Sequence, residues 1–218
     1  MQELVTITGM ILKTVPIGEY DRRLVILTKE RGKITAFAKG ARRQNSRLLA
    51  TTNYFCFGEF KLYQGRNSYT LMEANISNYF EELRIDFESA YYGMYFMEVM
   101  DYYTRENNDE KEMLKLLYQS LRALLAPGLS HILVRYIFEI KAMVINGEFP
   151  GIPMNMELEE DTKYTINYIV NSEISKLFTF RVADVVLSQL KSIADRYRRM
   201  MIDYELKSLE ILESLISS

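Results

Sequence analysis

The sequence has very few of the residues that bind transition metals or form disulfides. Cys56 is its only cysteine and His131 its only histidine. A zinc site of four cysteines, or of two cysteines and two histidines, is therefore excluded within one chain, and so is an internal disulfide. Cys56 lies in an apolar run and is expected to be buried, whereas His131 follows Ser130 at an expected helix start, which favours a surface or capping position. We expect no catalytic residue, no bound metal and no cofactor.

Long apolar runs and an N-terminal targeting pattern are also missing. No hydrophobic stretch approaches the roughly 18 residues that a membrane span needs, and residues 1–4 lack the basic start of a signal peptide. These features predict a cytoplasmic protein. With 48% hydrophobic and 26% charged residues, the 218-residue chain has a globular composition and can bury a core in one large or two smaller domains.

Charge is distributed unequally along the chain. Residues 1–80 contain twelve Lys/Arg and six Asp/Glu, which gives +6, whereas residues 81–218 contain fifteen and twenty-three, which gives −8. Opposite signs in the two parts indicate two domains with different partners. Most of the positive charge falls between residues 20 and 48, where nine cations stand against two acids. Such a concentration predicts binding to a polyanion, although composition does not separate DNA from RNA or from an acidic protein.

The basic stretch has the spacing of a β-hairpin. Apolar and β-branched residues predict two strands, 24–27 and 34–38, joined by a connection that contains glycine. Along the second strand, period-two alternation would place Lys33, Phe37 and Lys39 on one face. Cations there can contact phosphates and the ring can stack on a base, as a nucleic-acid groove requires.

The first 80 residues contain five strand patterns and a polar segment, 40–52, that we expect to be a mobile basic loop. This arrangement suits a small closed barrel, and the five-stranded OB-fold, which commonly binds single strands on its face and loops, is the natural candidate. The predicted fold class is α+β, with an OB-fold β-barrel at 1–80 and an all-helical domain at 81–218.

In the C-terminal part the hydrophobic period changes from 2 to 3.6, which predicts helices. Asp86 and Ser130 are expected to cap two of them at their N-termini, and Gly147 to end the second. The segment 163–170 is the exception, because we expect a short strand there.

Ordered sequence landmarks carry a resemblance to a known family. They are GMILK at 9–13, GEYDR at 18–22, TKERGK at 28–33 and AKGARR at 38–43 followed by SRL at 46–48. Later landmarks are LYQGR at 62–66, the Phe138-Glu139 helix leading to Gly147, and LKSLE at 206–210. With these motifs the chain resembles the RecO family of bacterial recombination mediators. The similarity is long and ordered in the N-terminal part and fades between about Gly147 and Ala183.

The resemblance implies a non-enzymatic protein with an OB-fold joined to a helical domain and a nucleoid-associated, cytoplasmic location. It implies binding to single- and double-stranded DNA, annealing of complementary strands and, with RecR, loading of RecA onto DNA covered by single-strand-binding protein (SSB). The DNA contacts expected from the motifs and the resemblance are Tyr20, Arg22, Arg23, Lys29, Arg31, Lys33, Phe37, Lys39, Arg42, Arg43 and Arg47.

The acidic C-terminal tail of SSB needs cations beside an apolar groove. Family similarity favours the helices around Arg135, with Arg122 and Lys141 as further cations. The basic cluster at 191–199 is an alternative dock. Ordinary solvated helix charges would also explain all of these residues.

One feature departs from the family pattern. Many relatives carry a four-cysteine zinc module after the position of Gly147, whereas no cysteine follows Gly147 here. We therefore predict no zinc and expect the segment 148–180, a degenerate form of that module, to be held by packing or to be partly disordered.

Two other function classes remain open. An RNA-binding or translation-associated OB-fold module would need the same basic hairpin. An enzyme acting on nucleic acid usually needs clustered carboxylates for metal ions, and the basic stretch offers only Asp21 and Glu30. Asp21 adjoins Arg22 and Arg23, which favours a structural salt bridge and places the enzyme last.

Overall fold

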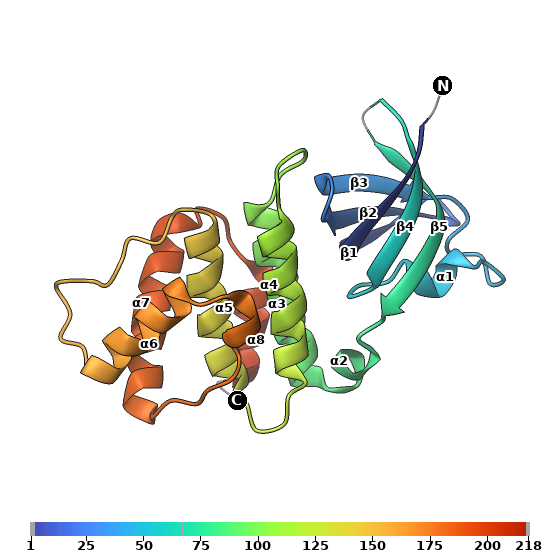
Figure 1. The fold of residues 1–218 in the computed structure, drawn as a ribbon. Coiled ribbons are helices and arrows are strands. Elements are labelled where there is room, and N and C mark those ends of the chain that lie inside the picture. The colour runs from blue at the N-terminus through green and yellow to red at the C-terminus, as the bar shows by residue number, and fades with distance from the viewer. Residues whose placement is uncertain (1–2, 67, 217–218) are drawn as a thin grey trace. The chain divides into compact units, whose positions relative to one another are not determined.

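The computed structural model describes residues 3–66 and 68–216, which fall into two compact units (Figure 1). The first unit consists of Met1–Glu81 and Met97–Leu114, and the second of Glu82–Phe96 and Lys115–Ser218. Helices α3 (Phe87–Tyr103) and α4 (Lys111–Leu124) therefore each contribute residues to both units.

The first unit is built on a closed five-stranded barrel (Figure 1). Its strands are β1 (Glu3–Ile17), β2 (Asp21–Thr28), β3 (Gly32–Ala38), β4 (Phe57–Gln64) and β5 (Tyr69–Asn78). They are hydrogen-bonded in the order β1-β2-β3-β5-β4, β4 pairs back onto β1, and β3 runs parallel to β5 while the other pairs are antiparallel. An OB-like barrel followed by helices confirms the predicted α+β fold class.

Alternation along the strands separates the barrel core from its outer face. In β3 the even-numbered residues are buried and the odd-numbered ones half-buried. Ile34 and Ala36 belong to the core cluster, together with Phe60 and Cys56, both of which are fully buried. Burial of Cys56 confirms the sequence expectation, and the period of 2 explains why the polar residues of β3 share the outer face.

The remaining helices are short or belong to the second unit. They are α1 (Leu48–Thr51), α2 (Glu81–Ile85), α5 (His131–Ile145), α6 (Glu160–Asn171), α7 (Asp184–Met201) and α8 (Lys207–Ile216), with a 3₁₀ turn η1 (Ile174–Lys176). Helix α5 is buried over most of its length, and α5, α6 and α7 pack against one another. No helix in the described part of the chain is long and apolar enough to cross a membrane.

Two expected helix starts are found where the sequence placed them. The backbone N–H of Ser89 donates to Oδ2 of Asp86 over 2.9 Å, so Asp86 caps α3. Ser130 immediately precedes α5, but its side chain makes no capping hydrogen bond, so only the position of the expected cap is confirmed. Gly147, with a φ of +76°, follows the end of α5.

The strand predicted at 163–170 is wrong, because this segment belongs to helix α6. Its buried residues are Thr162, Thr165, Ile166 and Ile169. Their spacing of three and four residues is that of one helix face. The β-branched side chains favour a strand locally, but packing of this face decides for a helix.

The segment 148–180 is held by packing, which was one of the two expected alternatives. Ile166, Ile169, Ile174 and Leu177 are each at most 1% exposed. These side chains form a hydrophobic core in this segment. Among the residues that the structure describes, no three His, Cys, Asp or Glu side chains gather where a metal ion could bind.

Candidate nucleic-acid interface

The loop after β3 is anchored to the turn between β1 and β2. The Gly40 N–H donates to Oδ1 of Asp21 over 2.7 Å, and the Arg42 N–H donates to the Tyr20 carbonyl over 2.8 Å. Ala41, between them, is fully buried in the barrel core. Asp21 therefore has a structural role, but the partner found is the Gly40 amide and not an arginine of the expected salt bridge. The neighbouring side chains project from a fixed base.

Tyr20, Arg42 and Arg43 come together at this anchor, and we call them the loop cluster. The guanidinium of Arg43 lies 5.2 Å from the Tyr20 ring centroid, within cation–π range. Nη1 of Arg42 donates to the Gly18 carbonyl over 3.3 Å. All three side chains are exposed. A hydrogen bond with Glu19 raises the pKa of the Tyr20 phenol, so the ring stays uncharged at neutral pH.

Arg22 lies at the N-terminal end of β2, close in sequence to Tyr20, and its side chain has internal hydrogen-bond partners. Its Nη1 donates to the Leu49 carbonyl, to Oγ1 of Thr52 and to Oδ1 of Asn53, at 3.1, 2.7 and 3.0 Å. Burial lowers the pKa of Arg22, and the nearby charge of Arg42 lowers it further. Arg22 thus ties α1 to the barrel, a structural role that the sequence did not indicate. The structure does not test the expected contact of Arg22 with DNA, and the three internal hydrogen bonds of this side chain favour the structural role instead.

A groove of about 410 Å³ lies on the outer face of β1–β3, and we call it the β-face groove. Its lining belongs entirely to the first unit. The residues are Lys13, Arg23, Val25, Lys33, Thr35, Asp101, Arg105 and Glu106. The strand register explains why the five strand residues in this list lie on one face. Lys13 pairs with Val25 across β1 and β2, and Val25 pairs with Thr35 across β2 and β3.

Asp101 of α3 binds two lysines in this groove. Its Oδ2 lies 2.5 Å from Nζ of Lys13, and its Oδ1 lies 3.0 Å from Nζ of Lys33. Burial raises the pKa of Asp101, but hydrogen bonds from the two lysines outweigh it and leave that pKa below its usual value. The carboxylate is therefore ionised at neutral pH.

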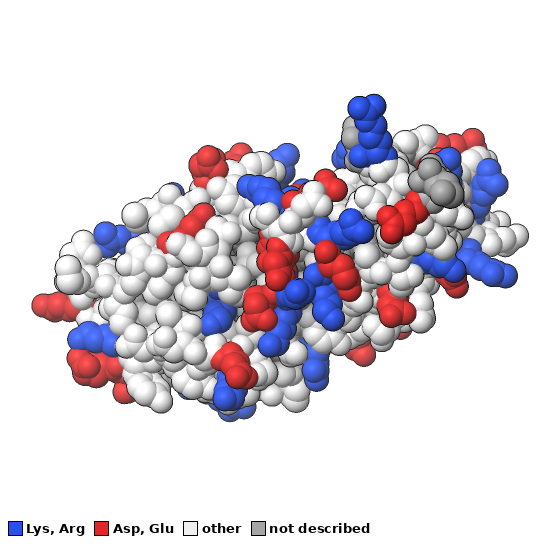
Figure 2. All heavy atoms as spheres, turned by 45° about the horizontal axis from the view of Figure 1, so that its top comes forward, with Lys and Arg blue, Asp and Glu red and all other residues white. Residues whose placement is uncertain are grey.

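The other predicted DNA contacts are spread over the barrel surface. Lys33 and Phe37 share the outer face of β3, as predicted, and Phe37 pairs with Arg23. Lys39 lies just beyond the end of that strand. Lys29, Lys39 and Arg47 are exposed, whereas Arg31 is half-buried. Figure 2 shows Lys and Arg side chains projecting from the barrel part of the molecule, with acidic side chains between them.

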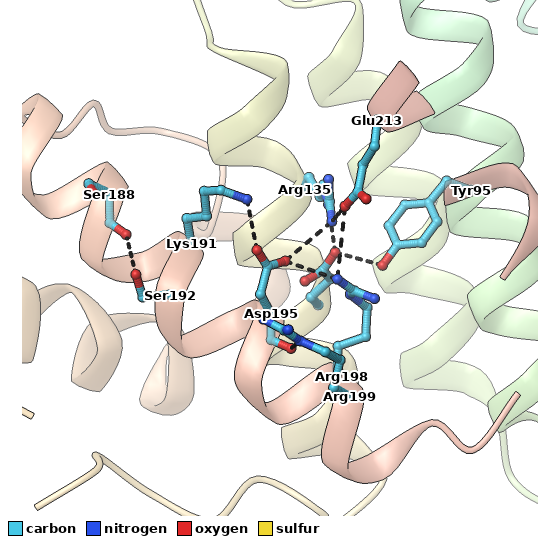
Figure 3. Close-up of polar contacts among 10 residues, drawn as sticks. Tyr95, Arg135, Ser188, Lys191, Ser192, Asp195, Arg198, Arg199 and Glu213 are labelled. Carbon is cyan, nitrogen blue, oxygen red and sulfur yellow. Dashed lines mark hydrogen bonds and ion pairs between the residues drawn. The ribbon is translucent and has the colours of Figure 1, made fainter. Parts of the chain in front are cut away.

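Arg135 is buried at the centre of an ion-pair network (Figure 3). Its Nε lies 2.7 Å from Oε1 of Glu139, and its Nη2 lies 3.5 Å from Oδ1 of Asp195 and 3.3 Å from Oε1 of Glu213. The Tyr95 hydroxyl donates to the same Glu139 oxygen over 2.6 Å. Burial lowers the pKa of Arg135, but the charges of Glu139 and Tyr95 and the hydrogen bond with Glu139 together outweigh burial and raise that pKa.

The three cations predicted to bind the SSB tail are not brought together as one exposed patch. Nζ of Lys141 donates to the carbonyls of Ile169, Val170 and Ser172 at 3.2, 2.9 and 2.8 Å, and so caps the C-terminus of α6. Lys141 and Arg135 are both buried. Only Arg122 is exposed. Sequence periodicity did not distinguish cations that satisfy internal carbonyls and carboxylates from cations in solvent.

Arg135 also lines a larger groove in the second unit, of about 730 Å³, which we call the α5–α7 groove. Its charged lining consists of the cations Arg135, Lys191, Arg198 and Arg199 and the acids Asp184, Asp195 and Glu213. Ile132 and Leu187 add apolar surface. Three of these cations come from the basic cluster at 191–199 that the sequence offered as an alternative dock.

His131 opens α5, as the sequence suggested, and its ring is largely buried. Nδ1 lies 3.1 Å from Oε1 of Glu88, and Nε2 lies 3.0 Å from the Leu124 carbonyl. The ring also packs edge-on against Tyr92. These contacts tie helix ends together within the second unit, and they indicate a structural role.

Comparison with known proteins gives a consistent result. The family model described as "Recombination protein O N terminal" matches residues 1–80, and "Recombination protein O C terminal" matches residues 84–151. The first match contains the barrel, the loop cluster and the lysines of the β-face groove.

Individual relatives agree with the family models. The DNA repair protein RecO of Acetivibrio thermocellus is 28% identical over 240 aligned positions, which cover 95% of this chain and 96% of that protein. The proteins of the same name from Clostridium novyi and Alkaliphilus metalliredigens are 32% and 34% identical over 139 and 149 positions. Those two alignments cover 64% and 68% of this chain, and 54% and 61% of the relatives.

Proposed function

The chain belongs to the RecO family of DNA repair proteins, and we propose that it is a recombination mediator that binds single- and double-stranded DNA and anneals complementary strands. With RecR, it helps to load RecA onto SSB-coated DNA at the nucleoid. It acts by binding and not by catalysis. The observation that carries the proposal is the loop cluster, which presents two arginines and an aromatic ring from an anchored base in a unit rich in positive charge.

The loop cluster suits a phosphate backbone of any sequence. Annealing brings two like-charged strands together, so cations that neutralise phosphates lower the repulsion. Contacts to phosphate carry no base information and leave base edges free to pair. The Tyr20 ring can stack on one unpaired base while Arg42 and Arg43 contact the adjoining phosphates. This geometry holds a strand open and ready to pair.

Fluorescence anisotropy of a labelled single-stranded oligonucleotide across a salt series tests the proposal. For Arg42→Glu/Arg43→Glu we expect affinity to fall by about tenfold or more at about 0.1 M salt, and the log–log salt slope to fall by about 1.4, since each phosphate contact on a single strand contributes about 0.7. An annealing assay with complementary oligonucleotides should lose rate in parallel.

Lys61→Glu/Arg66→Glu is the matched control. It changes the net charge by the same amount on the same barrel, and both side chains are exposed and lie outside the basic stretch. If both double variants lose affinity equally, overall charge and not the loop cluster governs binding. Wild-type affinity and slope in Arg42→Glu/Arg43→Glu would refute the loop cluster as the DNA site.

An RNA-binding OB-fold module is the competing function, because the loop cluster contacts phosphates and rings that both nucleic acids possess. Oligonucleotides of matched sequence in DNA and RNA form separate the two. We expect equal or tighter binding to DNA and protein-dependent annealing of DNA strands. A clear preference for RNA without DNA annealing would favour the competitor.

We propose the α5–α7 groove as the dock for the acidic, apolar-ended tail of SSB. Its lining carries four cations and three acids, a net charge of +1, beside two apolar side chains. Arg199, which is exposed, is expected to contact a tail carboxylate. Arg199→Ala should weaken binding of a tail peptide about fivefold, as an exposed ion pair of about 1 kcal/mol predicts. Arg122→Ala, outside the groove, is the control, and loss of binding in that variant alone would move the dock to α4.

A further inference from the structure

The β-face groove contains more cations than the loop-based proposal uses. Lys13, Arg23, Lys33 and Arg105 line it, against two acids, Asp101 and Glu106. The net charge of the lining is therefore +2, and it would be +3 without the carboxylate of Asp101. Arg23 is exposed, and Lys13 is 41% exposed even while paired. The groove is thus cationic and open to solvent.

Asp101 occupies the point where two cations from different strands converge. Lys13 comes from β1 and Lys33 from β3, and both ammonium groups reach the same carboxylate. Nζ of Lys33 also donates to the Asp101 carbonyl. A carboxylate and a phosphodiester are both oxyanions that accept hydrogen bonds from ammonium groups.

We propose that the β-face groove is a second subsite for the phosphate backbone of a nucleic-acid strand, and that Asp101 holds the position of a phosphate until a strand displaces it. This inference rests on the proposed function, because it adds a subsite to the same DNA-binding unit. In this proposal Lys13 and Arg105 also contact the nucleic acid, although both lie outside the basic stretch at 20–48.

The exchange keeps both lysines paired, because a phosphate replaces the carboxylate as their partner. Asp101 and Lys33 are only 21% and 22% exposed, so the carboxylate must move toward solvent as the phosphate enters, whereas Lys13, at 41% exposed, is already partly hydrated. A phosphate entering the groove finds Arg23 in addition to the two lysines. Phe37 pairs with Arg23 across β2 and β3 and offers a ring for an adjoining base. Lys33 and Phe37 are four residues apart, or about 13 Å along an extended strand, a length that several phosphates of one strand can follow.

Removal of the Asp101 charge provides the test. Asp101→Asn should bind a labelled single-stranded oligonucleotide about fivefold to twentyfold more tightly at about 0.1 M salt, with a salt slope steeper by about 0.7 to 1.4, the contribution of one or two phosphate contacts. Adding Lys33→Gln to Asp101→Asn should remove most of the gain. Asp109→Asn is the control, because Asp109 lies in the same unit but makes an exposed pair with Lys111.

Lys13→Gln/Lys33→Gln, with Asp101 intact, gives an independent measurement if Asp101→Asn folds poorly. It should weaken DNA binding and reduce the salt slope by about 1.4. Thermal melting of every variant separates loss of fold from loss of contact. Wild-type affinity and slope in this folded double variant would overturn the subsite.

The outcomes for the subsite and for the proposed function are distinguishable. If wild type binds DNA and folded Asp101→Asn binds it no more tightly, the subsite is overturned while the function stands. If only Asp101→Asn binds, the subsite stands and the function proposed for the wild-type chain falls. If neither binds even at low salt, both fall.

Discussion

Gly32 and Arg105 meet backbone to backbone in the first unit. A Cβ on Gly32 would lie 2.3 Å from the Arg105 carbonyl oxygen, and the φ of Gly32 is +65°. The same carbonyl accepts the Lys33 N–H over 2.9 Å, and the Asn107 N–H donates to the Arg31 carbonyl over 3.0 Å. Only glycine combines this conformation with so close an approach. The connection between β2 and β3 therefore fixes the end of α3 beside the β-face groove.

Gly32→Ala should destabilise the protein by about 2–4 kcal/mol, from left-handed strain and from the clash with the Arg105 carbonyl. Urea unfolding measures the loss. Gly18→Ala is the matched control, because Gly18 also has a positive φ of +54° but its Cβ would meet nothing within 4 Å. It should cost only the strain, about 1 kcal/mol. Equal losses in the two variants would show that the close approach contributes nothing.

Arg22→Gln should act mainly on stability. It removes hydrogen bonds to Leu49, Thr52 and Asn53 and should cost about 1–3 kcal/mol in urea unfolding. The salt slope of DNA binding should stay within experimental error of wild type. Arg23→Gln, at the exposed neighbouring position, should lower the salt slope of DNA binding and leave the free energy of unfolding unchanged. A lower slope with unchanged stability in Arg22→Gln would establish a phosphate contact instead.

Arg135→Met should destabilise the helical unit by about 3–5 kcal/mol, because it leaves the buried carboxylate of Glu139 without its cation. Arg135→Met/Glu139→Leu should recover much of that loss, since an apolar pair has no charge to desolvate. Chemical unfolding of the two single variants and the double variant completes a double-mutant cycle. Additive losses would mean that the two side chains are energetically independent despite their 2.7 Å separation.

Asp195 should make stability depend on acid pH. Burial raises the pKa of Asp195, but hydrogen bonds from Lys191 and Arg198 outweigh it and lower that pKa. A carboxyl whose folded pKa lies below its unfolded value, about 3.9, stabilises the fold above that value. The contribution disappears as the pH falls through the folded pKa.

The difference in unfolding free energy between wild type and Asp195→Asn measures this effect. It should be constant above about pH 5 and shrink steadily below about pH 3.9. A difference that does not change with pH would assign the effect of the substitution to packing alone.

Much of the fold was predictable because its signals are local. The period of 2 in β3, the cap at Asp86 and the helix start after Ser130 each depend on residues within one element. The charge surplus at 20–48 likewise pointed to the barrel surface and to the loop cluster. The strand predicted at 163–170 is wrong because the burial of one helix face, which depends on packing against other elements, decides for a helix there.

The sequence by itself determined the barrel-forming strands, the concentration of cations and the family landmarks, since these are properties of neighbouring residues. Only the tertiary structure decided which cations have internal partners. Lys13 and Lys33 lie 88 and 68 residues from Asp101 along the chain, and Lys141 lies 28 or more residues from the carbonyls that it binds. Partners so distant in sequence meet only after the elements have packed, and burial then makes pairing of the charges necessary.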